Sequence, residues 1–192
     1  MKKKHIITIA GKLGSGKSST AKSLSELLNY KHYSTGDFMR DIANKRGISL
    51  NDLSLLAETD TSIDEILDKN NIEIGKQENI VLDSRLGFHF IPESFKVFLD
   101  LDPTIASERI LEDKKVNSNR QTEATGSFDT KESITEKINN RLLSERKRYK
   151  ELYNIEDHTS YNNFDLVINT EKIPLDKVVN TIMEAYKKWL IN

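Results

Sequence analysis

A glycine-rich stretch near the start of the sequence is Gly11-Lys12-Leu13-Gly14-Ser15-Gly16-Lys17-Ser18. It matches the pattern G-x-x-x-x-G-K-[ST] of a phosphate-binding loop. The β-branched and apolar residues of 5–10 precede it and predict a buried strand, and apolar residues recur at helical spacing over 21–28 after it. A strand, a glycine-rich loop and a helix in this order are the context that such a loop requires, so the pattern indicates a nucleoside triphosphate site.

The chemistry of the loop supports the same interpretation. Its glycines let the backbone turn tightly and bring N–H groups close to an anion, and the following helix directs the positive end of its dipole at the same point. Lys17 adds a full charge for the β- and γ-phosphates, and Ser18 offers a hydroxyl to Mg²⁺. We expect residues 11–18 and the adjacent Ser19 to bind ATP. The alternative, a glycine-rich turn that binds nothing, does not explain the flanking strand and helix.

Composition excludes several other classes of protein. The 192 residues favour one domain, 1–192, and 29 basic against 30 acidic residues give a net charge of −1, which lacks the footprint of a nucleic-acid binder. Without cysteine there is neither a disulfide framework nor a thiolate metal site. No apolar run approaches the ~20 residues of a membrane span, and no signal peptide is evident. We expect a cytoplasmic monomer.

Short apolar strands alternate with helical segments along the rest of the chain. This alternation predicts an α/β fold of three layers, in which helices flank a parallel five-stranded sheet. Residues 36–75 are predicted to form a small helical insert with an acidic surface. The polar segment 114–131 has few apolar anchors, and we interpret it as a short lid.

A second group of candidate residues follows the predicted strand 31–34. Gly36 is expected to end that strand, and Asp37 to cap the next helix. Arg40 would then lie one turn into the helix, where its guanidinium could reach a second phosphate near the helix start. A surface arginine on an ordinary helix is an equally good explanation from spacing alone.

Two further segments carry candidate charges. The strand 79–83 ends in Asp83, which we expect near Ser18 behind the waters of Mg²⁺, although a simple turn would also place a carboxylate there. Arg85 follows it and could point into the same crevice. On the long helix predicted over 131–153, Arg141, Glu145 and Arg148 form one row. The row is either a ladder of salt bridges or a set of cations that faces the cleft.

The stretch Ser34-Thr35-Gly36-Asp37-Phe38-Met39-Arg40, together with the loop, resembles nucleoside monophosphate kinases. Nearly the whole chain looks most like cytidylate kinase, in the compact form typical of archaea and some bacteria. Four further stretches carry this resemblance: 81–87, 106–110, 144–153 and 165–170. The run Ser144-Glu145-Arg146-Lys147-Arg148-Tyr149 is the most specific of them.

The resemblance implies roles for individual residues. Lys17, Arg141 and Arg148 would act on the transferred phosphoryl group, and Arg109 would lie beside the adenine of ATP. Asp60 is added only from its position in the acidic insert, next to Thr59, as a candidate contact to the base. The implied acceptor-nucleotide contacts are Ser34, Gly36, Asp37, Arg40, Arg85, Arg141, Glu145 and Arg148.

The expected activity is the transfer of a phosphoryl group from ATP to CMP or dCMP with Mg²⁺. An adenylate kinase or another nucleoside monophosphate kinase of the same fold is the first alternative. A non-catalytic nucleotide-binding switch is the second, although a switch would not require the additional arginines. A nucleic-acid binder is poorly supported because the net charge is near zero.

Overall fold

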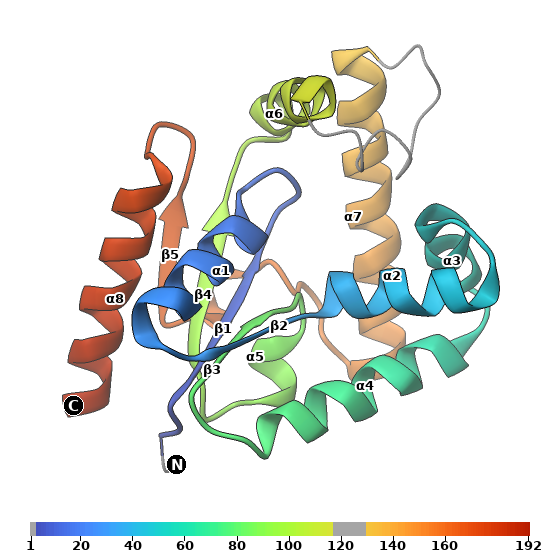
Figure 1. Ribbon diagram of the computed structural model, residues 1–192. Coiled ribbons are helices and arrows are strands. Elements are labelled where there is room, and N and C mark those ends of the chain that lie inside the picture. Colours follow the sequence, from blue (N-terminus) through green and yellow to red (C-terminus); the bar gives the residue numbers. More distant parts are fainter. Residues whose placement is uncertain (1–2, 117–129) are drawn as a thin grey trace.

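A five-stranded sheet forms the centre of the molecule (Figure 1). The computed structural model describes residues 3–116 and 130–192. All pairings of neighbouring strands are parallel, and the order is β2-β3-β1-β4-β5. The strands are β1 (Ile6–Gly11), β2 (Lys31–Ser34), β3 (Ile80–Asp83), β4 (Phe95–Asp100) and β5 (Leu166–Asn169).

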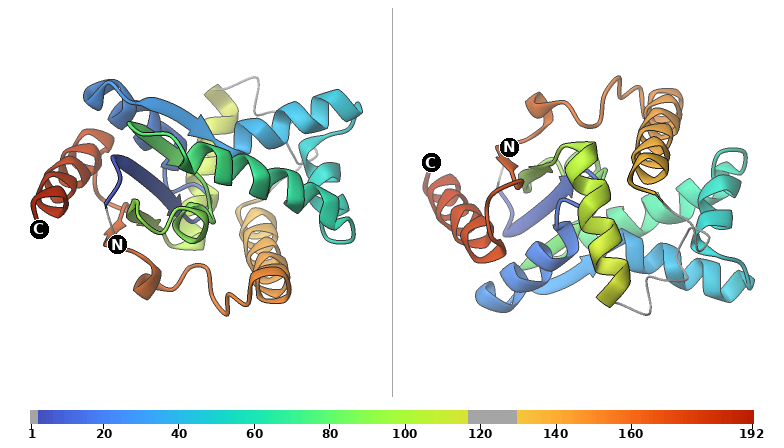
Figure 2. Two further views of the ribbon diagram at one scale, coloured as in Figure 1. Left: turned by 90° about the horizontal axis from the view of Figure 1, so that it is seen from below. Right: turned by 90° about the horizontal axis from the view of Figure 1, so that it is seen from above.

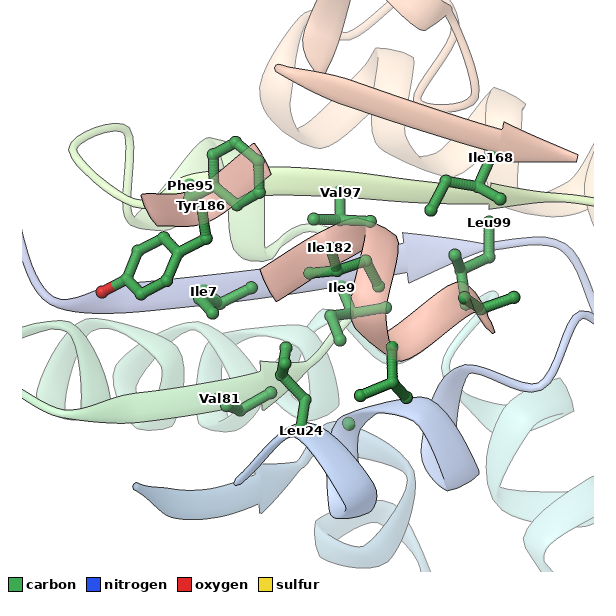
Figure 3. Packing of buried hydrophobic residues seen from close by; sticks show 13 residues of the cluster. Ile7, Ile9, Leu24, Val81, Phe95, Val97, Leu99, Ile168, Ile182 and Tyr186 are labelled. Carbon is green, nitrogen blue, oxygen red and sulfur yellow. The ribbon is translucent and has the colours of Figure 1, made fainter. Parts of the chain in front are cut away.

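Helices cover both faces of the sheet. Because side chains alternate along a strand, Ile7 and Ile9 join the core beneath α1 (Lys17–Leu28) and α8 (Leu175–Ile191), as Figure 3 shows. Ile6 instead packs with Leu82 and Ile91 on the opposite face, close to α5 (Gly87–Phe90). The predicted three-layer α/β fold with a parallel five-stranded sheet is confirmed.

Three helices after β2 form a lobe at the opposite end of the molecule from α8 (Figures 1 and 2). They are α2 (Thr35–Arg46), α3 (Leu50–Leu56) and α4 (Thr61–Gly75). The lobe has its own apolar core of Ala43, Leu53, Ala57 and Ile63. Its helices span 35–75, and the interpretation of about 36–75 as an insert that binds the acceptor stays a prediction.

Two long helices pack side by side after β4, α6 (Pro103–Val116) and α7 (Lys131–Tyr153). Ile134 and Ile138 of α7 meet Ala106 of α6 in an apolar cluster that also includes Leu13 of the glycine-rich loop. The loop therefore rests on this helix pair. A short 3₁₀ turn, Tyr161–Asn163, leads from α7 toward β5. The lid expected at about 114–131 lies almost entirely outside the described residues.

One predicted helix cap is wrong. Ser34, not Asp37, caps α2, because Ser34 still has extended backbone angles and its hydroxyl accepts from the Asp37 N–H at 3.2 Å. Asp37 already lies in the first helical turn, where its charge favours the positive end of the helix dipole. Within the described ranges, no helix has both the length and the apolarity to cross a membrane.

Candidate functional site

The backbone of the loop requires glycine where it passes the neighbouring elements. Gly11 has φ +154°, and a Cβ there would lie 2.4 Å from the carbonyl oxygen of Leu99 on β4. Gly14 has φ +74°, and its Cβ would lie 3.1 Å from the Ala106 Cα of α6. The first contact is too close for any Cβ, and the second would force α6 to move by a few tenths of an ångström at a position whose positive φ already favours glycine. The glycines therefore let the loop lie against β4 and α6.

The loop leads directly into the amino-terminal end of α1. Gly16 occupies the cap position with φ 86° and provides no side-chain cap, so the first N–H groups of the helix are left for another acceptor. Lys17, Ser18 and Ser19 form that first turn. An anion placed there would meet backbone donors and the positive end of the helix dipole, which fits the phosphates of a nucleotide.

Lys17 is half-buried in the loop, where its Nζ donates to the carbonyl oxygen of Lys12 at 2.9 Å. Burial and the positive charge of Arg85 lower its pKa from 10.5 to about 8, against the opposing effect of Asp83. A half-buried ammonium whose hydrogen bond goes to a neutral carbonyl oxygen is poorly compensated. It would gain from a phosphate group beside it.

Ser18 meets the end of β3, where its Oγ donates to Asp83 Oδ2 at 2.6 Å. The parallel pairing of β1 with β3 places Asp83 beside Ile9, next to the loop. Hydroxyl and carboxylate oxygens are ligands that Mg²⁺ accepts, directly or through water. In the ranges that the structure covers, no group of three or more His, Cys, Asp or Glu is arranged to hold a metal.

Glu145 of α7 binds two arginines at once. Its Oε1 accepts from Arg141 Nε at 2.9 Å, and its Oε2 lies 3.1 Å from Arg85 Nε. Burial opposes ionisation of this carboxyl, yet Arg85 and Arg141 together hold its pKa well below the usual value. The Arg85 charge also lowers the pKa of Arg141, so the two guanidinium groups are crowded together. Their positive charges both act on Lys17.

The row predicted on α7 is therefore divided. Arg141 and Glu145 form an i,i+4 salt bridge that also holds Arg85, so a salt-bridge pair and a set of cations coexist. Arg148 instead faces the lobe, with its Nε 3.7 Å from Asp64 Oδ2 on α4. Sequence patterns gave no signal for Asp64, because its partner lies on another element far along the chain.

The residues that were expected to contact the acceptor from the lobe lie near the start of α2 and at the start of α4. A Cβ built on Gly36 would lie 3.5 Å from Ser34 Oγ and 3.9 Å from the Arg40 guanidinium, so these three residues are neighbours. Arg40 forms an ion pair with Asp37. Asp60 caps α4 by accepting from the Ser62 N–H at 3.0 Å. Its expected contact to a base stays a prediction.

Arg109 of α6 joins two segments at the other side of the loop. Its Nη2 donates to the carbonyl oxygens of Thr170 at 2.6 Å and Glu171 at 3.0 Å, and its Nη1 reaches the Gly14 carbonyl oxygen at 3.5 Å. The side chain thus connects the loop with the segment after β5. A purine ring beside the loop would meet Arg109 here.

His158 was not predicted to belong to the site, because no motif or spacing marks it. The structure buries its ring beside Glu145, with Nε2 at 3.6 Å from Oε2. Only the path of the chain after α7 brings the two residues together.

Comparisons with known proteins agree with this geometry. A family model described as an AAA domain matches residues 7–126. The cytidylate kinase of Methanosphaera stadtmanae is 35% identical over 183 residues, which cover 94% of this chain and 96% of that protein. The S-adenosylmethionine-dependent nucleotide dehydratase of Lacinutrix mariniflava is 35% identical over 184 residues, 95% of this chain. The chain spans 36% of the length of that dehydratase.

Among solved structures, the shikimate kinase of Bacteroides thetaiotaomicron has a similar fold. Its TM-score is 0.63, with 13% identity, and the match covers 96% of this chain and 97% of that chain. This likeness supports the fold alone. The identity to cytidylate kinases, which this chain covers over almost their full length, shows the family. The chain belongs to the cytidylate kinase family of P-loop kinases.

Proposed function

We propose that this protein transfers the γ-phosphoryl group of ATP to CMP, and to dCMP, giving ADP and the pyrimidine nucleoside diphosphate. One observation carries the proposal. Lys17 of the phosphate-binding loop lies within the electrostatic reach of both Arg85 and Arg141, which come from other elements. A site that only holds a triphosphate would not need these two arginines in addition to Lys17.

The chemistry explains why cations matter more than a base. The phosphate of a nucleoside monophosphate has its second pKa near about 6, so it is largely a dianion at neutral pH and needs no strong base to attack. The difficulty is to bring two polyanions together and to stabilise the charge that spreads over the transferred group. Positively charged groups held in fixed positions lower that barrier.

We assign the residues as follows. The loop backbone and Lys17 hold the β- and γ-phosphates of ATP, and Arg109 lies beside the adenine. Arg85 and Arg141 lie between the donor and acceptor phosphates, while Arg148 and Arg40 reach the acceptor from α7 and α2. The acceptor is also contacted by Ser34, Gly36, Asp37, Asp60 and Glu145.

Ser18 and Asp83 would hold Mg²⁺, Ser18 directly and Asp83 through water. When bound, the ion would neutralise charge on the donor phosphates. The short bond between Ser18 and Asp83 orients both oxygens toward one place at the end of β3. A monomeric state stays a prediction.

The test is a steady-state assay of ADP release with ATP, Mg²⁺ and a panel of monophosphates: CMP, dCMP, UMP, AMP and GMP, with shikimate included. We expect CMP to give the highest kcat/KM. Preference for AMP would favour the adenylate kinase alternative, and tight ATP binding without transfer to any acceptor would favour a nucleotide-binding switch. Lys17→Ala should fold and lose turnover, and residual activity near the wild-type rate would contradict the assignment of the loop.

A further inference from the structure

We propose that His158 is a positioning residue, which holds the Glu145 carboxylate in place and thereby sets the orientation of Arg85 and Arg141. The inference rests on the proposed phosphoryl transfer. It concerns a residue that lies outside the loop, the lobe and the arginine row. The imidazole is 4% exposed, and it meets Glu145 on the side that carries Oε2.

A buried carboxylate must have its lone pairs satisfied in every state of the enzyme. In this structure Oε1 binds Arg141, and Oε2 lies near both Arg85 and His158. When the arginines turn toward substrate phosphates, Glu145 loses part of their contact. His158 approaches the same oxygen as Arg85, with 3.6 Å between Nε2 and Oε2, which is longer than a hydrogen bond. A small shift of the carboxylate toward the imidazole would bring the two atoms within bonding distance, so His158 can keep the carboxylate aligned when the arginines turn away.

The two ring nitrogens of His158 have different surroundings. Nε2 faces Glu145, whereas Nδ1 is buried and finds no hydrogen-bond partner among the residues that the structure describes. A proton on Nδ1 would leave a buried donor unsatisfied, while a bare Nδ1 leaves only a lone pair. The surroundings therefore favour a proton on Nε2, the nitrogen that faces Glu145, over a proton on Nδ1 alone.

The rest of the turn is built to hold this ring. Arg146 forms a two-pronged contact with Asp157, from Nε to Oδ1 at 3.2 Å and from Nη2 to Oδ2 at 2.8 Å. Asp157 Oδ1 also accepts from the Thr159 N–H at 2.8 Å. The His158 ring packs edge-on against Tyr149 at a centroid distance of 4.9 Å. Residues on both sides of His158 are thus fixed to α7, and the ring has little freedom.

Two amide variants separate hydrogen bonding from packing. In His158→Gln the side-chain NH₂ can take the place of Nε2, while in His158→Asn the shorter side chain takes the place of Nδ1 and does not reach Glu145. We expect His158→Asn to lower kcat/KM for CMP about tenfold, since the group that approaches the Glu145 carboxylate is lost and Arg85 and Arg141 are held less firmly. His158→Gln should stay within about threefold of wild type by the same reasoning, and KM for ATP should change less than twofold in both.

Glu156→Gln is the matched control in the same turn, because the Glu156 side chain is 72% exposed and binds Lys150 away from Glu145. Its kinetics should equal those of wild type. Equal losses in His158→Asn and His158→Gln would overturn the proposal and leave only a packing role. Wild-type kinetics in His158→Asn would overturn it as well.

A spectroscopic measurement on the wild-type protein needs neither activity nor a variant that folds. Long-range ¹H–¹⁵N correlation spectra of the imidazole should show a proton on Nε2 of His158 at neutral pH, and a proton on Nδ1 would overturn the proposal. If the wild-type protein does not phosphorylate CMP, the proposed function fails while this spectrum still tests His158. If CMP is phosphorylated and the variants behave alike, the inference about His158 fails alone.

Discussion

Ser18 of the phosphate-binding loop and Asp83 at the end of β3 share a hydrogen bond of 2.6 Å, although 65 positions separate them in the chain. The two residues come from the strand–loop–helix unit and from the neighbouring parallel strand. The contact therefore places a hydroxyl and a carboxylate where the metal of a donor nucleotide is expected.

The first prediction concerns Asp83→Asn. We expect kcat to fall about 10–100-fold and the Mg²⁺ concentration for half-maximal activity to rise, because the group that orients the ligand and its water is lost. Activity against free Mg²⁺ measures this effect. ATP binding in EDTA should not weaken, since a carboxylate beside a polyanion has been removed. Asp102→Asn is the control, because Asp102 caps α6 through Thr104 and Asn caps equally well. An unchanged Mg²⁺ profile in Asp83→Asn would contradict the assignment.

The second prediction follows from the pKa of Lys17. Burial and Arg85 lower it to about 8, so at pH 8.5 most molecules of the free enzyme have a neutral Lys17. Phosphates favour the ammonium form, and ATP binding at pH 8.5 should therefore take up roughly three quarters of a proton at Lys17. At pH 6.5 Lys17 is already charged, so the proton uptake at Lys17 on ATP binding should vanish.

Calorimetry in two buffers that differ in ionisation enthalpy measures this proton uptake. Lys17→Arg is the reference, since arginine stays charged at both pH values. The difference between wild type and this variant isolates Lys17 from the titration of ATP itself. Equal proton uptake by the two proteins at pH 8.5 would show that Lys17 is charged before ATP binds.

The fold and the donor half of the site could be predicted from the sequence because their signals are local. The loop, its flanking strand and its helix are contiguous, and Asp83 is recognisable as the end of a buried strand. The cap of α2 was predicted at the wrong residue because Ser34 and Asp37 are both good capping types. Only the backbone shows that Ser34 is extended and Asp37 already helical.

The acceptor half could not be predicted to the same depth. Spacing on α7 left open whether the row that contains Glu145 is a ladder of salt bridges or a set of cations that faces the cleft. The answer depends on Arg85, which comes from another element. The same holds for Arg148, whose partner Asp64 lies on α4. Contacts between elements distant in the chain leave no periodic pattern in the sequence.

A third prediction concerns the stability that Glu145 contributes. Glu145→Gln should lower the free energy of unfolding at pH 7 by roughly 2–3 kcal/mol. This loss is smaller than the loss expected for a fully buried ion pair, because the Arg141 side chain is 42% exposed and water screens its charge. Since Arg85 and Arg141 depress the pKa of Glu145 against the effect of burial, the difference is fully present above the usual pKa of 4.5. It should shrink as the pH falls through the depressed pKa.

Urea unfolding at pH 7 and at several lower pH values measures this difference. Glu151→Gln, an exposed position on the same helix, is the control and should show no such dependence. A difference between wild type and Glu145→Gln that stays constant down to the lowest accessible pH would mean that the Glu145 charge does not stabilise the fold.

The last prediction separates the two substrate sites through Arg109. Its guanidinium bridges the carbonyl oxygens of Thr170, Glu171 and Gly14, so it fixes the segment after β5 against the loop. Arg109→Lys keeps the positive charge but not the planar fork that makes several bonds at once. We expect KM for ATP to rise about tenfold, which corresponds to the loss of about 1.4 kcal/mol of binding, while KM for CMP stays within twofold. Because the hydrogen bonds of Arg109 go to the loop and to the segment after β5, and not to Glu145 or its two arginines, the acceptor site should not be affected. Equal increases in both KM values would mean that Arg109 supports the whole cleft rather than the ATP side.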